Sequence, residues 1–244
     1  MTKIKSTLLF LIGLFAISCT QTNNDTSELK EGDSNTTVVS NQTIDIKTEK
    51  YIDAVLDTIF KTEQTPIRKR DSLMKIYGPD SKEFQHYQAI YKKNHVVNER
   101  KVKELLATYG WPGEDVIGYR GSLTMCNVIQ HADNEVRLEL LPLMRRAVQD
   151  KKLNPALLAR TEDRIATEQG KLQMYGGQMK YYPETKSFNV WPVYDPANID
   201  KRRAAIGLGP IAEHLKSRFD FEWNLDEQIK RTEAFEKARK NKEQ

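Results

Sequence analysis

Residues 80–110, DSKEFQHYQAIYKKNHVVNERKVKELLATYG, predict one long helix, and this segment decides the fold class. Apolar and aromatic residues recur on it every three or four positions, as on the buried face of an α-helix: Phe84, Tyr87, Tyr91, Val102, Leu105 and Tyr109. Asn94 and Asn98 fall on the same face. Burying an amide without partners costs on the order of 1–3 kcal/mol. Each asparagine should therefore either hydrogen-bond within the protein or line a polar cleft open to a ligand.

Helical periodicity continues on both sides of this segment. Upstream, apolar residues between Ile52 and Phe60 follow the same spacing. The pair Thr65-Pro66 has the pattern of a capping residue followed by proline at the first helical position, so we expect one helix to end there and another to run on to Gly78. Downstream we expect helices over about 121–133, 135–151, 155–170 and 198–207, one opened by Pro210, and one from about Leu225.

A change of pattern between residues 171 and 193 indicates a β-hairpin. Residues 171–182 are rich in aromatic and polar side chains, residues 183–186 have the composition of a turn, and residues 188–191 alternate. The predicted fold class is therefore mainly α. It is a single helical domain, residues 47–244, with one β-hairpin near residues 171–193.

The first 18 residues have the features of a secretory signal peptide. Lys3 and Lys5 precede an apolar run, residues 8–17, which is shorter than the roughly 20 residues needed to span a bilayer. The run ends in Phe-Ala-Ile-Ser-Cys19, which resembles the lipobox of bacterial lipoproteins. The resemblance implies cleavage before Cys19 and attachment of fatty acyl chains there, which together give a stable anchor. The alternative is an ordinary secreted protein with a cysteine at this place by chance.

The residues after the predicted cleavage point indicate a flexible tether and a location in the cell. Residues 19–46 are rich in Thr, Asn, Ser and Asp, so they have little to bury and are typical of a disordered tether. Thr20 is not acidic, and acidic residues next to the lipidated cysteine often retain lipoproteins in the inner membrane. We therefore expect a protein of the bacterial cell envelope, facing the periplasm or the outside, with its lipid anchor in the outer membrane.

The composition indicates which partners are disfavoured and what role the second cysteine has. The net charge of +4 falls to +2 when the signal peptide removes Lys3 and Lys5, and no basic block stands out. Nucleic-acid binding is therefore disfavoured. With Cys19 lipidated, Cys126 cannot form an intramolecular disulfide, and we expect it to be a buried core residue.

Several polar residues interrupt the apolar pattern and are candidates for a site. Gln130, His131 and Asp133 end a helix; on a regular helix His131 and Asp133 diverge, but at a helix end they could converge. Asp163 and Arg164 are neighbours within a later helix, so each must pair elsewhere.

The predicted hairpin and the short helix after it add further candidates. On a regular strand Gln173 and Tyr175 share a face, which Gln178 joins only if a bulge intervenes. Arg202 and Arg203 follow in the short helix, where a surface position is the default for any one arginine.

These residues also carry a resemblance. The order and spacing of Gly-Trp-Pro at 110–112, Gln-His-Ala-Asp at 130–133, Asp-Arg at 163–164, Gln-x-Tyr-Gly-x-Gln at 173–178 and Arg203 ahead of Gly-Leu at 207–208 resemble a family of bacterial proteins with an uncharacterised domain, many of them lipoproteins. The resemblance covers roughly residues 50–215. Gly177 stands where the family has threonine, which puts a hydroxyl role there in doubt. The resemblance implies domain limits and candidate positions, and no particular reaction.

Common enzyme signatures are missing. The sequence has no phosphate-binding glycine loop, no dinucleotide fingerprint and no serine in a G-x-S-x-G elbow. A metal site from His95, His131 and Asp133 can be imagined, but no helical pair of histidines supports it. We therefore predict neither a metal nor a cofactor.

The favoured hypothesis is binding of a polar small molecule, sugar, peptide or wall fragment. Its site would lie where the helix of the two asparagines, the His131 segment, the Asp163 helix and the hairpin meet. His131 and Asp133 would form the reactive or contacting pair, and Arg164 and Arg203 would balance carboxylates or hold an anion. The other contacts are assigned to Asn94, Asn98, Gln130, Asp163, Gln173, Tyr175 and Gln178.

Two alternatives remain open. One is a hydrolase that uses His131 as a general base. The other is a structural or partner-binding envelope protein, in which the polar residues form a satisfied internal network.

Overall fold

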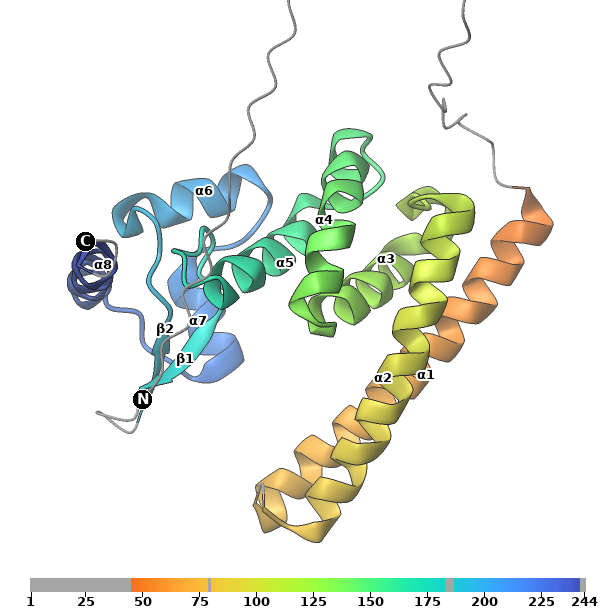
Figure 1. The fold of residues 1–244 in the computed structure, drawn as a ribbon, viewed down its shortest axis with the longest axis horizontal. Helices are drawn as coiled ribbons and strands as arrows, with labels where there is room; N and C mark the ends of the chain where they lie inside the picture. Colours follow the sequence, from red (N-terminus) through yellow and green to blue (C-terminus); the bar gives the residue numbers. More distant parts are fainter. Residues whose placement is uncertain (1–44, 79, 183–186, 242–244) are drawn as a thin grey trace, which may run out of the picture. The chain divides into compact units, whose positions relative to one another are not determined.

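The computed structural model describes residues 45–78, 80–182 and 187–241 (Figure 1). The mainly helical class with one β-hairpin is confirmed. In chain order the elements are α1 (Ile46–Tyr77), α2 (Lys82–Tyr109), α3 (Glu114–His131), α4 (Asn134–Gln149), α5 (Pro155–Glu168), β1 (Met179–Tyr182), β2 (Ser187–Val190), the 3-10 turn η1 (Pro196–Asn198), α6 (Ile199–Ala205), α7 (Ile211–Phe219) and α8 (Leu225–Lys240). The predicted signal peptide, Cys19, nearly all of the predicted tether and the predicted turn at 183–186 lie outside the described residues.

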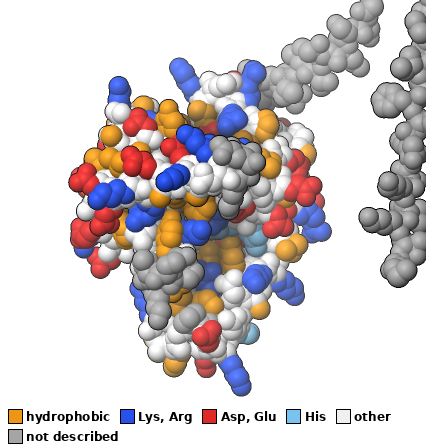
Figure 2. All heavy atoms as spheres, turned by 60° about the vertical axis from the view of Figure 1, so that its left-hand side comes forward, with side chains coloured by type: hydrophobic (Ala, Val, Ile, Leu, Met, Phe, Trp, Pro, Cys, Tyr) orange, Lys and Arg blue, Asp and Glu red, His pale blue; other side chains and the backbone are white. Residues whose placement is uncertain are grey.

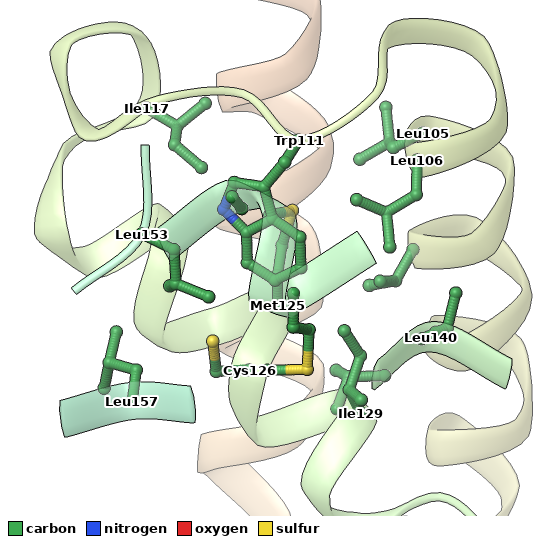
Figure 3. Packing of buried hydrophobic residues seen from close by; sticks show 14 of the residues in the cluster. Leu105, Leu106, Trp111, Ile117, Met125, Cys126, Ile129, Leu140, Leu153 and Leu157 are labelled. Atoms are coloured by element: carbon green, nitrogen blue, oxygen red, sulfur yellow. The ribbon is translucent and has the colours of Figure 1, made fainter. Parts of the chain in front are cut away.

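The larger hydrophobic core is built by α1 to α5. Figure 3 shows side chains from α2, α3, α4 and α5 gathered around Trp111 and Met125. Cys126 is buried in this core, as predicted, and burial raises the pKa of its thiol. A chemically inert thiol is the consequence, because the reactive form of cysteine is the thiolate.

A smaller core lies beneath the hairpin. It joins Val190 of β2 to Val193, to Ile199 of α6 and to Ile211 and Leu215 of α7. α8 is attached to the same region by polar contacts: the buried Gln228 donates to the Trp191 carbonyl at 3.2 Å, and the Thr232 hydroxyl donates to the Val193 carbonyl at 3.2 Å.

The predicted break at Thr65-Pro66 is wrong, because α1 runs through Pro66 as one helix that lies beside α2 (Figure 1). Proline has no backbone N–H, so the carbonyl of Thr62, one turn earlier, loses its usual helical donor. The side-chain amide of Asn94 on α2 donates to that carbonyl at 2.9 Å. A neighbouring helix therefore replaces the missing hydrogen bond, which sequence periodicity along α1 alone does not reveal.

Asn98 continues this contact one turn further along α2. Its amide nitrogen donates to the Thr62 hydroxyl at 3.0 Å and to a carboxylate oxygen of Glu63 at 2.9 Å. Asn98 and Glu63 are both buried. The two asparagines on the apolar face of α2 are thus hydrogen-bonded inside the protein to a single turn of α1.

The hairpin is shorter than expected. β1 begins at Met179 instead of near residue 171, and it pairs antiparallel with β2 from Met179 opposite Val190 to Tyr182 opposite Ser187. Residues 171–178 form a loop instead, with Gln173 making one parallel bridge to Val193. Gly176 in this loop has φ of 76°, which L side chains rarely adopt, and an added Cβ would lie 2.7 Å from Ile211 Cδ1, so a larger residue would be strained and would displace the Ile211 side chain.

No helix in the described part of the chain is both long and apolar enough to cross a membrane.

The pairing of Asn94 with the Thr62 carbonyl can be tested by a double-mutant cycle. Asn94→Ala should lower the free energy of unfolding by about 1–3 kcal/mol, because it leaves a partly buried carbonyl unpaired. Pro66→Ala returns a backbone N–H to the same carbonyl, so the double variant should recover most of that loss. Urea unfolding followed by circular dichroism measures both.

The exposed neighbour Lys93 provides the control, since Lys93→Ala should change stability little. Equal losses in Asn94→Ala with and without Pro66→Ala would contradict the proposed pairing.

Candidate functional site

Several of the residues predicted for a site, together with Glu63 and Tyr91, which were not predicted, form two groups with different partners. The first group, which we call the loop network, consists of Asp163, Gln173, Arg203 and the backbone of residues 174–178. The second, which we call the inter-helix cluster, consists of Glu63 on α1, Tyr91 and His95 on α2, His131 at the end of α3 and Arg164 on α5.

Asp163 organises the loop network. Its carboxylate accepts hydrogen bonds from the backbone N–H groups of Met174 at 2.8 Å, Tyr175 at 3.0 Å and Gly177 at 2.9 Å. Burial raises the pKa of Asp163 to about 6, against the opposing effect of these three N–H donors. At neutral pH the carboxylate is therefore ionised and accepts all of them, which fixes residues 174–177 as a loop.

Gln173 and Arg203 complete the same loop. The fully buried amide of Gln173 donates to the carbonyls of Gln178 at 3.0 Å and Trp191 at 2.8 Å, and its oxygen accepts from the Gln178 N–H at 2.8 Å. Arg203, also buried, donates to the carbonyls of Tyr175 at 2.6 Å and Gly209 at 2.7 Å. These polar atoms are occupied by the backbone, so the network holds the loop and the hairpin against α5 and α6.

Glu63 and His95 form the first pair of the inter-helix cluster. His95 Nδ1 lies 3.3 Å from a carboxylate oxygen of Glu63, the oxygen that also accepts from Asn98. A proton on Nδ1 satisfies this contact and leaves a lone pair on His95 Nε2. Nε2 is buried and has no hydrogen-bond partner among the described residues. The imidazole is thus oriented by a carboxylate on one side, and its other nitrogen is buried in the structure without a partner among the described residues.

His131 and Arg164 form the second pair. An NH1 nitrogen of Arg164 lies 3.1 Å from His131 Nδ1. Because a guanidinium can only donate, this contact assigns the lone pair of a neutral imidazole to Nδ1 and the proton to Nε2. Burial, followed by the charge of Arg164, lowers the pKa of His131 to about 4. His131 is nevertheless an exposed residue, so a ligand can reach it.

Arg164 also hydrogen-bonds to the backbone at the end of α3. Its NH1 donates to the Gln130 carbonyl at 3.2 Å, and Arg137 donates to the carbonyls of Gln130 and Ala132. Two cations thus satisfy the last carbonyls of α3, where the helix dipole favours positive charge. Arg137 is paired with Glu168, whereas no carboxylate of the described residues forms a salt bridge with Arg164.

Tyr91 lies beside the first pair, with its ring centroid 5.7 Å from that of His95. Burial and the charge of Glu63 raise the pKa of Tyr91 to about 12, while Arg70 and Arg164 act in the opposite direction. His95, Glu63 and Arg70 likewise act on His131. Arg70 itself is paired with Asp71 at 2.7 Å.

Other predicted residues have less defined positions. Asp133 is exposed at the N-cap of α4, makes no side-chain cap hydrogen bond and has no hydrogen bond to His131 in the described part of the chain. Tyr175 and Gln178 contribute backbone groups to the loop network, and Gln130 contributes its carbonyl to the two arginines.

Sequence reasoning missed Glu63. The signal was present, since Ile52, Leu56, Ile59, Glu63 and Pro66 follow one another at intervals of four, three, four and three residues, and all five are buried on one face of α1. Because a helix break was expected two residues later, at Thr65, Glu63 was not recognised as an acidic residue on the apolar face of a continuous helix.

Surface hollows elsewhere are lined by other residues. One lies between α1 and α2 beside Lys69, Leu73, Lys82 and Tyr87, and another lies between α1 and α3 beside Asp57. The face drawn in Figure 2 carries Lys and Arg side chains interspersed with Asp and Glu, without a broad area of one sign. The inter-helix cluster is distinguished by its chemistry and not by the size of a cavity.

Comparison with known proteins places the chain in a family. The family of unknown function DUF6624 matches residues 79–222. The chain belongs to this family. No curated protein and no solved structure matches the chain. The DUF6624 match confirms the resemblance to an uncharacterised domain; it contains His95, His131 and Arg164, whereas Glu63 lies on α1, before the matched residues.

The pKa of His131 is a direct test of this geometry. We expect it near 4, against about 6.5 for an unfolded chain, and we expect Arg164→Gln to raise it by removing a cation and freeing Nδ1. Because the folded pKa is the lower one, stability that is present above about pH 6.5 is lost as the pH falls towards 4. NMR titration of the imidazole resonances measures the pKa, and a value of about 6.5 or higher would contradict the contact.

Proposed function

We propose that the protein is a bacterial envelope lipoprotein whose helical domain binds a polar ligand at the inter-helix cluster. The observation that carries the proposal is the pair of Arg164 and His131: no carboxylate of the described residues forms a salt bridge with Arg164, and His131 is exposed. A partly buried charged group normally has a partner, so an unpaired guanidinium beside an exposed histidine supports a ligand site.

Binding is favoured over catalysis by His131. A general base needs a free lone pair and a pKa near the working pH. The lone pair of His131 Nδ1 faces an Arg164 N–H, and burial lowers its pKa to about 4. His131 is suited to donating a hydrogen bond from Nε2 instead. The loop network supports this division, because Asp163, Gln173 and Arg203 are engaged with backbone groups and position the loop.

A second candidate function rests on His95. Its Nδ1 contact with Glu63 and its unused Nε2 have the arrangement of an acid-oriented general base. In this reading, His95 Nε2, which is buried in the structure, would have to become accessible to the hydroxyl or water from which it takes a proton. Turnover of a wall or peptide substrate that is lost in His95→Gln would establish the enzyme in place of the binding protein.

The lipoprotein part of the proposal rests on Cys19 and the preceding apolar run. Cells fed radiolabelled palmitate should label the wild-type protein and not Cys19→Ser, because the thiol is the acceptor of the diacylglycerol. Cys126→Ser is the matched control and should keep the label, since Cys126 is buried. Labelling that persists in Cys19→Ser, or that is absent in the wild type, would contradict lipidation at this position.

Ligand binding can be screened by thermal unfolding with muropeptides, amino sugars and short peptides. A ligand at 100 times its Kd stabilises the folded state by about 2.7 kcal/mol, which raises the Tm by several degrees. We expect His131→Ala to weaken binding of any such ligand about tenfold, while His86→Ala, in the hollow between α1 and α2, should have no effect. Equal binding by the wild type and His131→Ala would contradict this site.

A further inference from the structure

The connected ends of α1 and α2 lie outside both hydrophobic cores. The last buried residue of α1 is Pro66 and the first of α2 is Asn98, and no described residue between them is buried. The two helices lie side by side here (Figure 1). We call residues 68–77 of α1 and 82–87 of α2 the distal end of the helix pair. Its side chains are placed for contact with something other than the core.

Three large apolar side chains are exposed within four positions at the end of α1. The exposed fraction is 42% for Met74, 65% for Ile76 and 59% for Tyr77. Single exposed apolar residues are ordinary on a protein surface, whereas neighbouring ones mark a contact surface. A tyrosine beside aliphatic side chains is also typical of protein segments that lie at the boundary between water and lipid.

Cations without acidic partners surround these apolar side chains. Four exposed ones form no salt bridge in the described part of the chain: Arg68, Lys69, Lys75 and Lys82. Exposed lysines elsewhere are paired, such as Lys103 with Glu139. Residues 68–82 hold five Lys or Arg and two Asp, so this end of the molecule is positively charged. A second copy of the same surface would be repelled, whereas an anionic surface would be attracted.

An open hollow between the two helices brings the cations and apolar atoms together. Its lining includes Lys69 and the half-buried Leu73 of α1, and Lys82, Glu83, His86 and the half-buried Tyr87 of α2. Ile76 follows Lys69 and Leu73 at helical spacing, so it lies on the same face of α1. Lysines from two helices thus border an apolar floor, and an exposed isoleucine continues that floor outwards.

We infer that the distal end of the helix pair binds the surface of a bilayer that contains anionic phospholipids. Lys69 and Lys82 would contact headgroup phosphates, and Ile76 and Tyr77 would enter the boundary with the acyl chains. A soluble polyanion would satisfy the lysines but not the exposed apolar side chains, which is why a lipid surface is favoured. The surface shares no residue with the inter-helix cluster, so the inference goes beyond ligand binding there.

The proposed anchor at Cys19 allows this contact. α1 has 32 residues and is therefore about 48 Å long. The 27 residues from Cys19 to Asp45 can span at most roughly 90 Å. A chain anchored at Cys19 can therefore bring the far end of α1 back to the membrane that holds its lipid.

The test uses residues 19–244 with Cys19→Ser, which carry no lipid and can bind a bilayer only through the protein surface. Sedimentation with vesicles measures the binding, with phosphatidylcholine alone compared with phosphatidylcholine containing a third of phosphatidylglycerol. Each Lys or Arg near an anionic bilayer contributes about fivefold in affinity, so we expect binding at least about tenfold tighter to the anionic vesicles. High salt should abolish most of this gain, because it screens the charges.

Variants assign the contacts. Lys69→Gln combined with Lys82→Gln should weaken binding to the anionic vesicles about tenfold or more. Ile76→Ser should weaken it several-fold, because the variant removes apolar surface that enters the bilayer. All three side chains are exposed, so the variants should keep the fold, which circular dichroism checks.

Two matched controls lie on other helices. Lys201→Gln changes an exposed lysine of α6, and Leu138→Ser changes a leucine of α4 that is 41% exposed. Each should bind the anionic vesicles within twofold of the chain without the second substitution.

Equal binding to the two kinds of vesicle would overturn the inference, as would undiminished binding of the double lysine variant or of Ile76→Ser. Undiminished binding of Ile76→Ser, together with equal binding to polyglutamate, would assign the surface to a soluble polyanion. Self-association that Ile76→Ser abolishes, without vesicle binding, would assign it to a second copy. Neither lipid on Cys19 nor a ligand at His131 enters the measurement, so the inference and the proposed function can fail separately.

Discussion

The missing N–H of Pro66 is the constraint on which the arrangement of α1 and α2 depends. A proline inside a helix leaves one carbonyl without a donor, and in water that defect would end or bend the helix. Here the Thr62 carbonyl accepts from Asn94, and the same turn of α1 holds Asn98 through the Thr62 hydroxyl and Glu63. The register between the two helices is fixed by polar contacts, because a one-turn shift would leave an amide, a carbonyl and a carboxylate unpaired.

This repair also determines the geometry of the candidate site. Glu63 is one residue after Thr62 and His95 is one residue after Asn94, so the contacts that stabilise α1 bring the Glu63 carboxylate to His95 Nδ1. On the other side, Arg164 satisfies the end of α3 and simultaneously fixes the proton of His131 on Nε2. Glu63, which links α1 to Asn98, also orients His95, and Arg164, which satisfies the end of α3, also orients His131. The same contacts therefore stabilise the helices and fix the orientation of the two imidazoles.

Much of the fold could be predicted from the sequence because its signals are local. Ser81 caps α2, Asn154 caps α5 and Asn224 caps α8, each through its own side chain, and the apolar periods give the helix type. The continuation through Pro66 could not be predicted in this way, since its donor, Asn94, is 28 positions further along the chain. The loop at 171–178 could not be distinguished from a strand in this way either, because the N–H groups of Met174, Tyr175 and Gly177 are satisfied by Asp163, on another element.

The candidate site, too, could be predicted only where its signals are local in the sequence. Periodicity identified Asn94 and Asn98 as polar residues on a buried face, but whether they face a ligand or a backbone depends on α1. The polar residues with the most conspicuous sequence pattern, Asp163, Gln173 and Arg203, are also those most completely engaged with backbone groups. Residues that hold a loop are placed by many contacts, whereas a ligand site needs atoms that are oriented on one side and unengaged on the other. His131 meets that condition, because Arg164 orients it and it is exposed, whereas the unengaged Nε2 of His95 is buried.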